Sequence, residues 1–506
     1  MNRMNAIKES FPAILWLSVL CIYWIGIIRI NFSPNPLLYC ADMYSDLMYG
    51  AAAWQEQSIF PEGWVFGNQY YAVATPVLAA LMFAFTDDPC TAMGIAATVM
   101  GLGVSLSFSW MLKPIFPLLR QRLAAVVLFM TAVLWCGDAA CTVNGWQLFF
   151  TMCSYYACYA ITAFLSIGCF LRRHNRHTPS WFPAVLLTCF FSFGTGIQSL
   201  RQTAITVIPI LAAAGWETAD CLRYHKPPPS DTLLLAGVLT LSNLLGLLYA
   251  AAVSAPKHEI FGNLSLSPAP DLLSAFCNLL GLFGNGWLLG LFLLAAAALY
   301  LVSGIEHWHR SHLLACLFLC LTATAVIFLI DNFTAMQIRS IYYFLLFPLA
   351  AVLFTHWFTE SKTVSSVLAV GVLVLSLIGG RHAPQSLPAW QADHPLQAVC
   401  DSLDEHGIST LYTQWNLGGR IAVASGFHVE VGFWDAADDV FEPVEYLCDP
   451  AVFDAAPDQC AYLISGAGNL ELAQSRAAAR QAEILVIEYF PELDAYLCTS
   501  DKALME

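Results

Sequence analysis

The chain has 506 residues, of which 58% are hydrophobic and only 11% are charged, and its mean hydropathy is +0.63. A typical soluble domain carries about 25% charged residues, so this composition excludes one large soluble domain and indicates apolar surface that faces lipid. The net charge of −15 comes almost wholly from the C-terminal residues 383–506. A segment this acidic should bind neither nucleic acid nor an anionic membrane surface, although we expect membrane lipids as partners of the apolar part.

Apolar runs of the length of a membrane span recur along residues 1–382. A bilayer core about 30 Å thick requires about 20 apolar residues per helical span. The runs lie at residues 11–31, 90–112, 122–137, 146–171, 181–198, 202–218, 231–253, 285–304, 312–331, 338–358 and 363–380. A shorter run at 71–86 is ambiguous. The first run follows Arg3 and Lys8 without a small-residue cleavage site, so we predict an uncleaved signal anchor.

Basic residues in alternate loops set the predicted orientation. They are Lys113, Arg120, Arg122, Arg172, Arg173, Arg176, Arg223, Lys226, Arg310 and Lys362. If the run at 71–86 does not fully cross, the other runs place all of these on the cytoplasmic side, as the positive-inside rule requires. The N-terminus is then cytoplasmic and residues 383–506 are extracytoplasmic. We interpret the basic clusters as topology determinants of a multi-pass protein in a plasma membrane, which we expect to be bacterial.

Residues 383–506 are predicted to form a second, soluble domain. They hold 20 acidic and 4 basic residues, so they carry almost all of the net charge. Short runs at 408–412, 420–424, 428–433, 461–464 and 484–489 are typical of strands, and those at 396–406 and 470–482 of amphipathic helices. The pattern predicts a small α/β or α+β domain. It carries no GxGxxG, P-loop, GxSxG or HExxH motif.

The 17 cysteines form no CxxC pair and no cluster with metal-ligand spacing. Most lie inside apolar runs, where cysteine serves as a small hydrophobic residue. Cys400, Cys448, Cys460 and Cys498 would allow two disulfides if the second domain is extracytoplasmic. The sequence does not decide among the three possible connectivities.

Carboxylates gather in the first predicted outer loop, residues 32–70. Ionisable residues are costly at membrane depth, so their positions are informative. The loop holds Asp42, Asp46 and Glu56. Asp42 and Asp46 are four residues apart, so a helix would place both on one face, where they could serve as a general base or as ligands for Mg²⁺ or Mn²⁺. A solvated helix next to the membrane is the alternative interpretation.

Cations come from later loops at the same predicted membrane face. Arg201 and Arg339 lie at the ends of spans, where a guanidinium can bind a lipid-linked phosphate through two hydrogen bonds. Ordinary snorkelling to the interface, or pairing with Asp331, is the alternative. Lys257 either joins this phosphate site or is simply solvated, and Asp138 in the second outer turn fits a helix cap as well as a catalytic role. Together these residues suit a transferase whose donor is a lipid phosphate.

Several segments resemble the GT-C superfamily of polytopic glycosyltransferases. They are CADMYSD at 40–46, PEGWVFGNQYY at 61–71 with Thr75-Pro76, Gly137-Asp138, IRSIYY at 338–343 with Phe347-Pro348, and LYTQWN at 411–416. The first three are similar to the acid-bearing first loop, the proline-led helix and the second acidic position of the family. The late Arg-Tyr…Pro pattern is similar to that of protein mannosyltransferase-like members.

The resemblance implies an α-helical polytopic membrane protein of about 11–13 transmembrane helices, with a small extracytoplasmic C-terminal α/β domain. It implies a glycosyltransferase domain at residues 1–382 and an acidic domain at 383–506. Such an inverting enzyme would transfer a sugar from a polyprenyl-phosphate-linked donor to an extracytoplasmic acceptor, which is a cell-envelope polymer, a lipid or a protein. A flippase of a lipid-linked intermediate and a non-catalytic scaffold or sensor are the alternatives.

The resemblance also implies roles for the residues singled out above. Asp42 would be the base, with Asp46 as the runner-up or as a helper, so the choice between them stays open. The donor phosphate would be bound by Arg201, Arg339 and Lys257. Asp138 and Glu56 would support the site. No metal ligand set is required, although a divalent cation such as Mg²⁺ or Mn²⁺ is an option.

Overall fold

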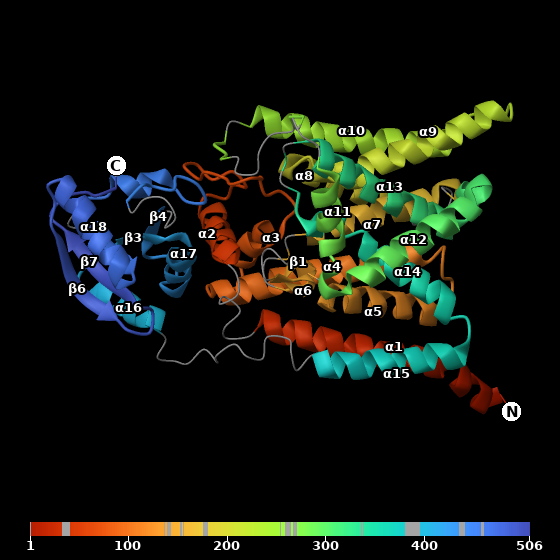
Figure 1. Cartoon of the computed structure of the whole chain (residues 1–506), viewed down its shortest axis with the longest axis horizontal. Coiled ribbons are helices and arrows are strands. Elements are labelled where there is room, and N and C mark those ends of the chain that lie inside the picture. The colour runs from red at the N-terminus through yellow and green to blue at the C-terminus, as the bar shows by residue number, and fades with distance from the viewer. Residues whose placement is uncertain are drawn as a thin grey trace.

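The computed structural model of the chain describes two parts, a helical bundle over residues 2–379 and a C-terminal domain over residues 395–505 (Figure 1). The residues it describes run from 2 to 505 except 33–40, 136, 139–142, 152–153, 155, 176–180, 254, 259–264, 267–270, 335, 337, 380–394, 435–440 and 457–459. The predicted domain boundary at 382/383 therefore lies outside the described residues.

Seven helices in the described part of the chain are long and apolar enough to cross a bilayer, which indicates a multi-pass membrane protein. They are α1 (Asn2–Asn31), α4 (Pro89–Leu112), α8 (Trp181–Gln198), η3 with α9 (Thr203–Arg223), α10 (Ser230–Ala252), α13 (His312–Phe333) and η6 with α14 (Ser340–Phe358). Shorter helices complete the bundle: α2 (Ala41–Gln55), α3 (Thr75–Met82), α5 (Leu119–Trp135), α6 (Gly145–Phe149), α7 (Ala157–Leu171), α11 (Leu272–Gly281), α12 (Trp287–Ser303) and α15 (Lys362–Gly379).

Three features of the bundle bear on the predicted spans. The ambiguous run at 71–86 forms only the eight-residue α3, which at 1.5 Å per residue is about 12 Å long and cannot cross a bilayer. The prediction of one continuous span over 146–171 is wrong, because α6 ends at Phe149 and Ser154 adopts a left-handed conformation before α7 begins. The ten-residue α11 was not predicted, since it is too short for a span-length window.

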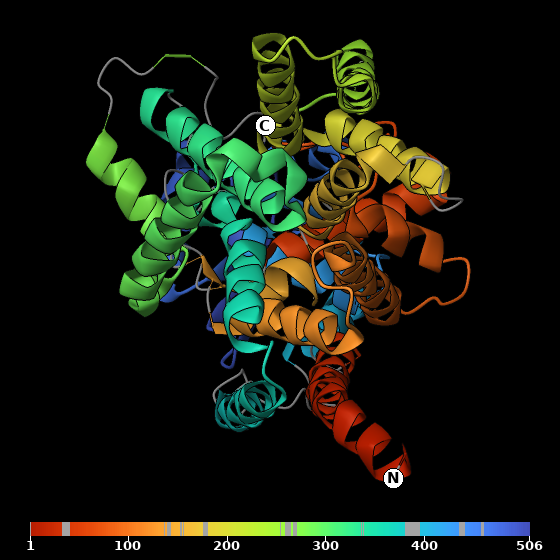
Figure 2. The ribbon, with the colours of Figure 1, turned by 90° about the vertical axis from the view of Figure 1, so that its right-hand side faces the viewer.

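The bundle places α14 at its centre and α1 and α10 at its outside (Figure 2). Most of α14 is buried, whereas most of α1 and α10 is exposed and apolar. In water such a surface would be unfavourable, so these faces are suited to lipid. Helix α1 lies beside α15 along the bundle, and the Trp16 indole donates to the Ser365 hydroxyl at 3.0 Å.

Helices α8 and α10 approach closely because glycine lies at their contact. A Cβ atom on Gly246 would clash with the Phe193 carbonyl oxygen, and one on Gly196 would lie 2.5 Å from the Asn243 carbonyl oxygen. Asn243 donates to the Ser192 carbonyl at 3.3 Å across the same contact. Small residues with one interhelical hydrogen bond are the usual means of packing helices in lipid, where apolar burial gives little driving force.

The C-terminal domain contains a five-stranded mixed sheet of order β4-β3-β5-β7-β6. Its strands are β3 (Thr410–Gln414), β4 (Glu430–Trp434), β5 (Cys460–Ser465), β6 (Ile484–Phe490) and β7 (Ala495–Ser500). β3 pairs in parallel with β4 and β5, and β7 pairs antiparallel with β5 and β6. Helices α16 (Pro395–Glu405), α17 (Trp415–Ala424) and α18 (Ala467–Ala479) accompany it, so the predicted α/β character is confirmed.

Two details of this domain differ from the sequence-based expectation. The predicted strand at 420–424 is the second half of α17, in which Leu417 and Ile421 lie one turn apart and are buried together. Strand β7 was not predicted. The four cysteines of the domain are free and buried, and the structure joins none of them in a disulfide.

Helix α17 packs against α2 and joins the C-terminal domain to the bundle. The Trp415 indole donates to the Ser45 hydroxyl at 2.8 Å, and the rings of Phe427 and Phe83 meet edge to face at 6.2 Å. Gly419 lies directly against Tyr44, which is buried. We call the end of the bundle that meets this domain the proximal end, and the other end the distal end.

The replacement Gly419→Val is expected to loosen the contact between α17 and α2. Even a single Cβ atom at this position would lie 2.7 Å from the Tyr44 Cβ atom, and overpacking of this kind costs about 1–3 kcal/mol. We expect faster cleavage between bundle and C-terminal domain in limited proteolysis and a lower unfolding temperature. Gly468→Ala is the control, because a Cβ atom there meets nothing within 4 Å. Equal behaviour of the two variants would contradict the contact.

Candidate functional site

Helix α2 carries the two predicted carboxylates at the proximal end. Asp42 lies in its first turn, where a negative charge suits the helix dipole, and Asp46 follows one turn later. Tyr49 continues the same face by i to i+3 spacing. Asp42 is partly exposed, whereas Asp46 is only 1% exposed. The two carboxylates therefore lie on the same face of α2, but only Asp42 is accessible to a ligand.

The buried Asp46 carboxylate lies close to the Tyr71 side chain, and its negative charge acts on the Tyr71 hydroxyl. Burial raises the pKa of Tyr71 well above its ordinary value, and the negative charges of Asp46 and Asp42 raise it further. Burial and Asp46 also raise the pKa of Tyr49. Both phenols therefore stay protonated near neutral pH.

Arg201 lies in the turn between α8 and α9 and is mostly buried. Its Nη1 atom donates to the Gln69 side-chain oxygen at 3.1 Å, and the Tyr159 hydroxyl donates to the same oxygen at 3.1 Å. Its guanidinium lies 4.8 Å from the centroid of the Tyr342 ring. Among the described residues no carboxylate forms an ion pair with Arg201. A guanidinium held in this way is suited to receive an anion.

One tripeptide of the first loop contacts three of the predicted site residues. Gln69 accepts the hydrogen bond from Arg201, and Tyr71 lies close to the Asp46 carboxylate. The ring of Tyr70, between them, lies 5.6 Å from the Lys257 ammonium. Because consecutive Cα atoms are about 3.8 Å apart, these three contacts lie within a short stretch of backbone. The tripeptide thus contacts a carboxylate and two cations that come from distant parts of the sequence.

The remaining candidates lie at different distances from this tripeptide. Arg339 is partly exposed and directly precedes η6, the short helix that contains Tyr342. The backbone of Asp138 belongs to β1 (Gly137–Asp138), which packs beside η6, and its side chain lies outside the described residues. Glu56 follows α2 and accepts a hydrogen bond from the Glu62 amide, so it closes a turn of the exposed loop. The structure gives Glu56 no contact with the tripeptide.

The segment after the tripeptide is fixed to the bundle through Gln198. Its side-chain oxygen accepts from the Val73 amide at 2.9 Å and from the Ala72 amide at 3.4 Å. The Thr75 hydroxyl donates to the Ser154 carbonyl at 3.4 Å. These bonds hold the loop where it enters α3, so the tripeptide is positioned by the membrane helices.

Five residues of the site were not singled out from the sequence as site residues: Gln69, Tyr70, Tyr71, Tyr159 and Tyr342. The first three belong to a segment of the family resemblance, and Tyr342 to another, which was the available signal. Tyr159 lies inside an apolar run, where a tyrosine is ordinary. No three His, Cys, Asp or Glu side chains gather as a metal site within the described ranges, so the structure adds no support for a divalent cation.

Comparison with models of protein families finds no match to the chain, and comparison with curated proteins finds no significant match.

Proposed function

We propose that the protein transfers a sugar from a polyprenyl-phosphate-linked donor to a hydroxyl acceptor outside the cytoplasm, as a polytopic glycosyltransferase of the GT-C type. The observation that carries the proposal is the Gln69-Tyr70-Tyr71 tripeptide, which contacts Arg201, Lys257 and Asp46. Its neighbours supply a carboxylate face and a buried cation at the end of a membrane bundle. A lipid-phosphate donor needs such an anion site next to the bilayer, beside a base for the acceptor.

The proposed mechanism is a single displacement. The partly exposed Asp42 carboxylate accepts the proton of the acceptor hydroxyl, and the hydroxyl oxygen attacks the anomeric carbon. The bond from that carbon to the phosphate oxygen breaks, and the bonding electrons leave with the polyprenyl phosphate. Arg201 stabilises the charge of the departing phosphate. Lys257, which lies by Tyr70, and Arg339, which directly precedes the helix of Tyr342, are the further proposed phosphate ligands. Asp46 lies close to Tyr71 and helps to orient this face of α2.

Transfer of radiolabelled sugar from synthetic polyprenyl-phosphate donors to a panel of acceptors tests the proposal. We expect the purified full chain to form labelled product only with a lipid-phosphate donor, and with inverted configuration at the anomeric carbon. Movement of labelled lipid across liposomes without any transfer would instead support the flippase. The described ionisable residues of the site lie at helix ends, which is unlike the midplane charges of a transporter.

Replacement of Arg201 by alanine is expected to lower kcat/KM for the lipid donor by about 10²-fold, because one charged donor to the leaving phosphate is lost. Arg201→Lys keeps the charge but loses the planar guanidinium, which can bind a phosphate through two hydrogen bonds. Its kcat/KM should therefore lie between those of the wild type and of Arg201→Ala. Lys257→Ala should have a smaller effect, since Lys257 is exposed. Arg223→Ala at the distal end is the control. Unchanged kinetics with Arg201→Ala would contradict the phosphate role.

A further inference from the structure

A second polar region lies at the distal end of the bundle, around a pocket of about 320 Å³. The pocket is lined from the end of α9, from the turn that leads into α10 and from η5 (Ile305–Arg310), which precedes α13. This volume is in the range of small-ligand sites. It is separate from the proximal site, because α7 (Ala157–Leu171) contains Tyr159 near Arg201 in its first turn and ends two residues before Arg173, which lies near this pocket.

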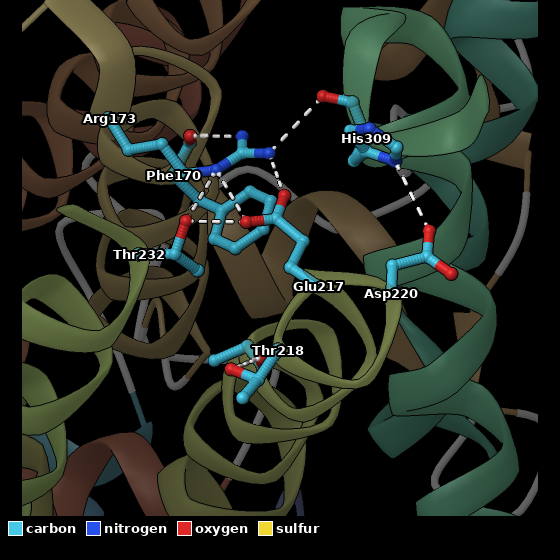
Figure 3. A network of polar contacts seen from close by, with 8 residues as sticks. Phe170, Arg173, Glu217, Thr218, Asp220, Thr232 and His309 are labelled. Carbon is cyan, nitrogen blue, oxygen red and sulfur yellow. Dashed lines mark hydrogen bonds and ion pairs between the residues drawn. The ribbon is translucent and has the colours of Figure 1, made fainter. Parts of the chain in front are cut away.

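Glu217, which lines the pocket, belongs to a buried ion pair with several further hydrogen bonds (Figure 3). Arg173 is 1% exposed and Glu217 is 4% exposed, and the two form a direct salt bridge. The Arg173 Nε atom also donates to the Thr232 hydroxyl at 3.0 Å, and its two terminal nitrogens donate to backbone carbonyls at 2.9 and 3.2 Å. The Glu217 charge is therefore neutralised, and the pair fixes this part of the pocket without binding a ligand.

The rim of the pocket carries charges of both signs. Asp220 and Glu306 supply two carboxylates, and Lys226 and Arg310 supply two permanent cations. The Lys226 ammonium lies 5.4 Å from the centroid of the Tyr224 ring, which also lines the pocket. Such a balance suits neither a simple anion nor a simple cation, and it matches a ligand that carries both charges.

His174 and His309 also line the pocket, and their imidazoles add no positive charge to the rim at neutral pH. Burial lowers the pKa of His309 below its ordinary value, and nearby Arg310 lowers it further, although Glu217 and Asp220 oppose the shift. Burial and the Arg173 charge lower the pKa of His174. His309 Nδ1 lies 3.8 Å from the Asp220 carboxylate. The rim therefore carries two negative and two positive charges near pH 7.

The pocket opens beside apolar helix surface. Leu222 near the end of α9 and Leu233 and Leu234 at the start of α10 are exposed, and all flank the turn that lines the pocket. Tyr224 is exposed within that turn. Exposed leucines followed by a tyrosine and basic residues are typical of a helix that leaves the membrane at the interface. A ligand in the pocket can therefore continue into acyl chains along α9 and α10.

We propose that this pocket binds a zwitterion with a phosphate and a primary ammonium, presented as the headgroup of a membrane phospholipid. Lys226 and Arg310 bind the phosphate, and Asp220 and Glu306 accept hydrogen bonds from the ammonium. The acyl chains lie against the exposed leucines of α9 and α10. The Arg173–Glu217 pair holds α7 and α9 together beneath the headgroup. The site is independent of the sugar-transfer proposal, because it uses none of the same residues.

Titration of the detergent-purified full chain with phosphatidylethanolamine tests the proposal, beside phosphatidylcholine and phosphatidylglycerol with the same acyl chains. We expect phosphatidylethanolamine to bind about tenfold more tightly than either, since the quaternary amine of phosphatidylcholine cannot donate and phosphatidylglycerol lacks a cation. Glu306→Gln and Arg310→Gln should each weaken the binding of phosphatidylethanolamine about tenfold. The matched controls are Glu360→Gln and Arg223→Gln, which lie at the distal end outside the pocket lining.

Each other outcome overturns the proposal in a defined way. If phosphatidylcholine bound as tightly as phosphatidylethanolamine, hydrogen bonds from the ammonium would not contribute to binding. If phosphatidylglycerol bound more tightly, the site would be a simple cationic patch. Pocket variants that bind like their controls would place the lipid elsewhere. The binding of soluble phosphoethanolamine is measured as well. If it bound as tightly as the lipid, the ligand would be a free zwitterion and the lipid source would be wrong.

Discussion

Replacing Asp42 with asparagine is expected to lower sugar transfer by about 10²- to 10⁴-fold, the usual contribution of a general base. The side chain keeps its size but can no longer accept the acceptor's proton. Because Asp42 is partly exposed in the first turn of α2, the loss of its charge should leave the fold intact. Transfer rates of the purified variant at saturating donor and acceptor measure the effect on kcat, and far-ultraviolet circular dichroism checks the fold.

Asp46→Asn is the companion variant that separates the two carboxylates. Asp46 is buried against Tyr71, so it cannot reach an acceptor without a change in α2. We expect a smaller loss of transfer, accompanied by lower stability, and Tyr71→Phe should share part of that loss because it removes the hydroxyl that lies close to this carboxylate. If Asp46→Asn abolishes transfer and Asp42→Asn does not, Asp46 is the base. If neither variant loses activity, the site lies elsewhere.

Replacing Arg173 with alanine is expected to destabilise the bundle by about 3–5 kcal/mol, because Glu217 would remain as a buried carboxylate without its partner. Arg173 also bonds to the Phe170 and His309 carbonyls, so the change disconnects α7 from η5. Denaturant titration of the detergent-solubilised protein measures the apparent free energy of unfolding. The loss should be present even without any lipid or substrate.

The double variant Arg173→Met with Glu217→Leu should recover most of that stability, since it removes both charges and fills similar volume. Arg172→Ala is the neighbouring control. Arg172 stacks on Trp110 at 3.9 Å and donates to backbone carbonyls, but the described residues give it no buried carboxylate partner. A double variant as unstable as Arg173→Ala alone would show that the ion pair is not the source of the loss.

Local sequence patterns predicted most helices of the bundle, because a lipid-facing helix needs a long apolar run irrespective of its neighbours. The run at 90–112 is recovered as α4 (Pro89–Leu112) and that at 181–198 as α8 (Trp181–Gln198). The break between α6 and α7 could not be predicted in this way. It depends on the left-handed conformation of Ser154, and residues around it are as apolar as those of a continuous helix.

The strand predicted at 420–424 failed for a related reason. Short apolar runs satisfy a helix and a strand equally well, and the contact of Gly419 with Tyr44 on α2 belongs to tertiary packing. The regular spacing at 396–406, by contrast, has a polar face and an apolar face, and it forms α16 as expected. Elements whose own sequence has a clear periodicity were therefore predicted correctly, and elements whose conformation depends on tertiary contacts were not.

By itself the sequence determined that the chain is a multi-pass membrane protein with an acidic α/β domain, and that Asp42 and Asp46 share a helix face, because composition and periodicity act locally. Only the tertiary structure decided which distant residues meet. Gln69 accepts a hydrogen bond from Arg201, Tyr70 lies by Lys257, and Tyr71 lies close to Asp46. From the sequence, Arg173 is part of a basic cluster interpreted as a topology determinant. The tertiary structure instead buries it in an ion pair with Glu217. Such contacts depend on helix packing, and no local pattern encodes them.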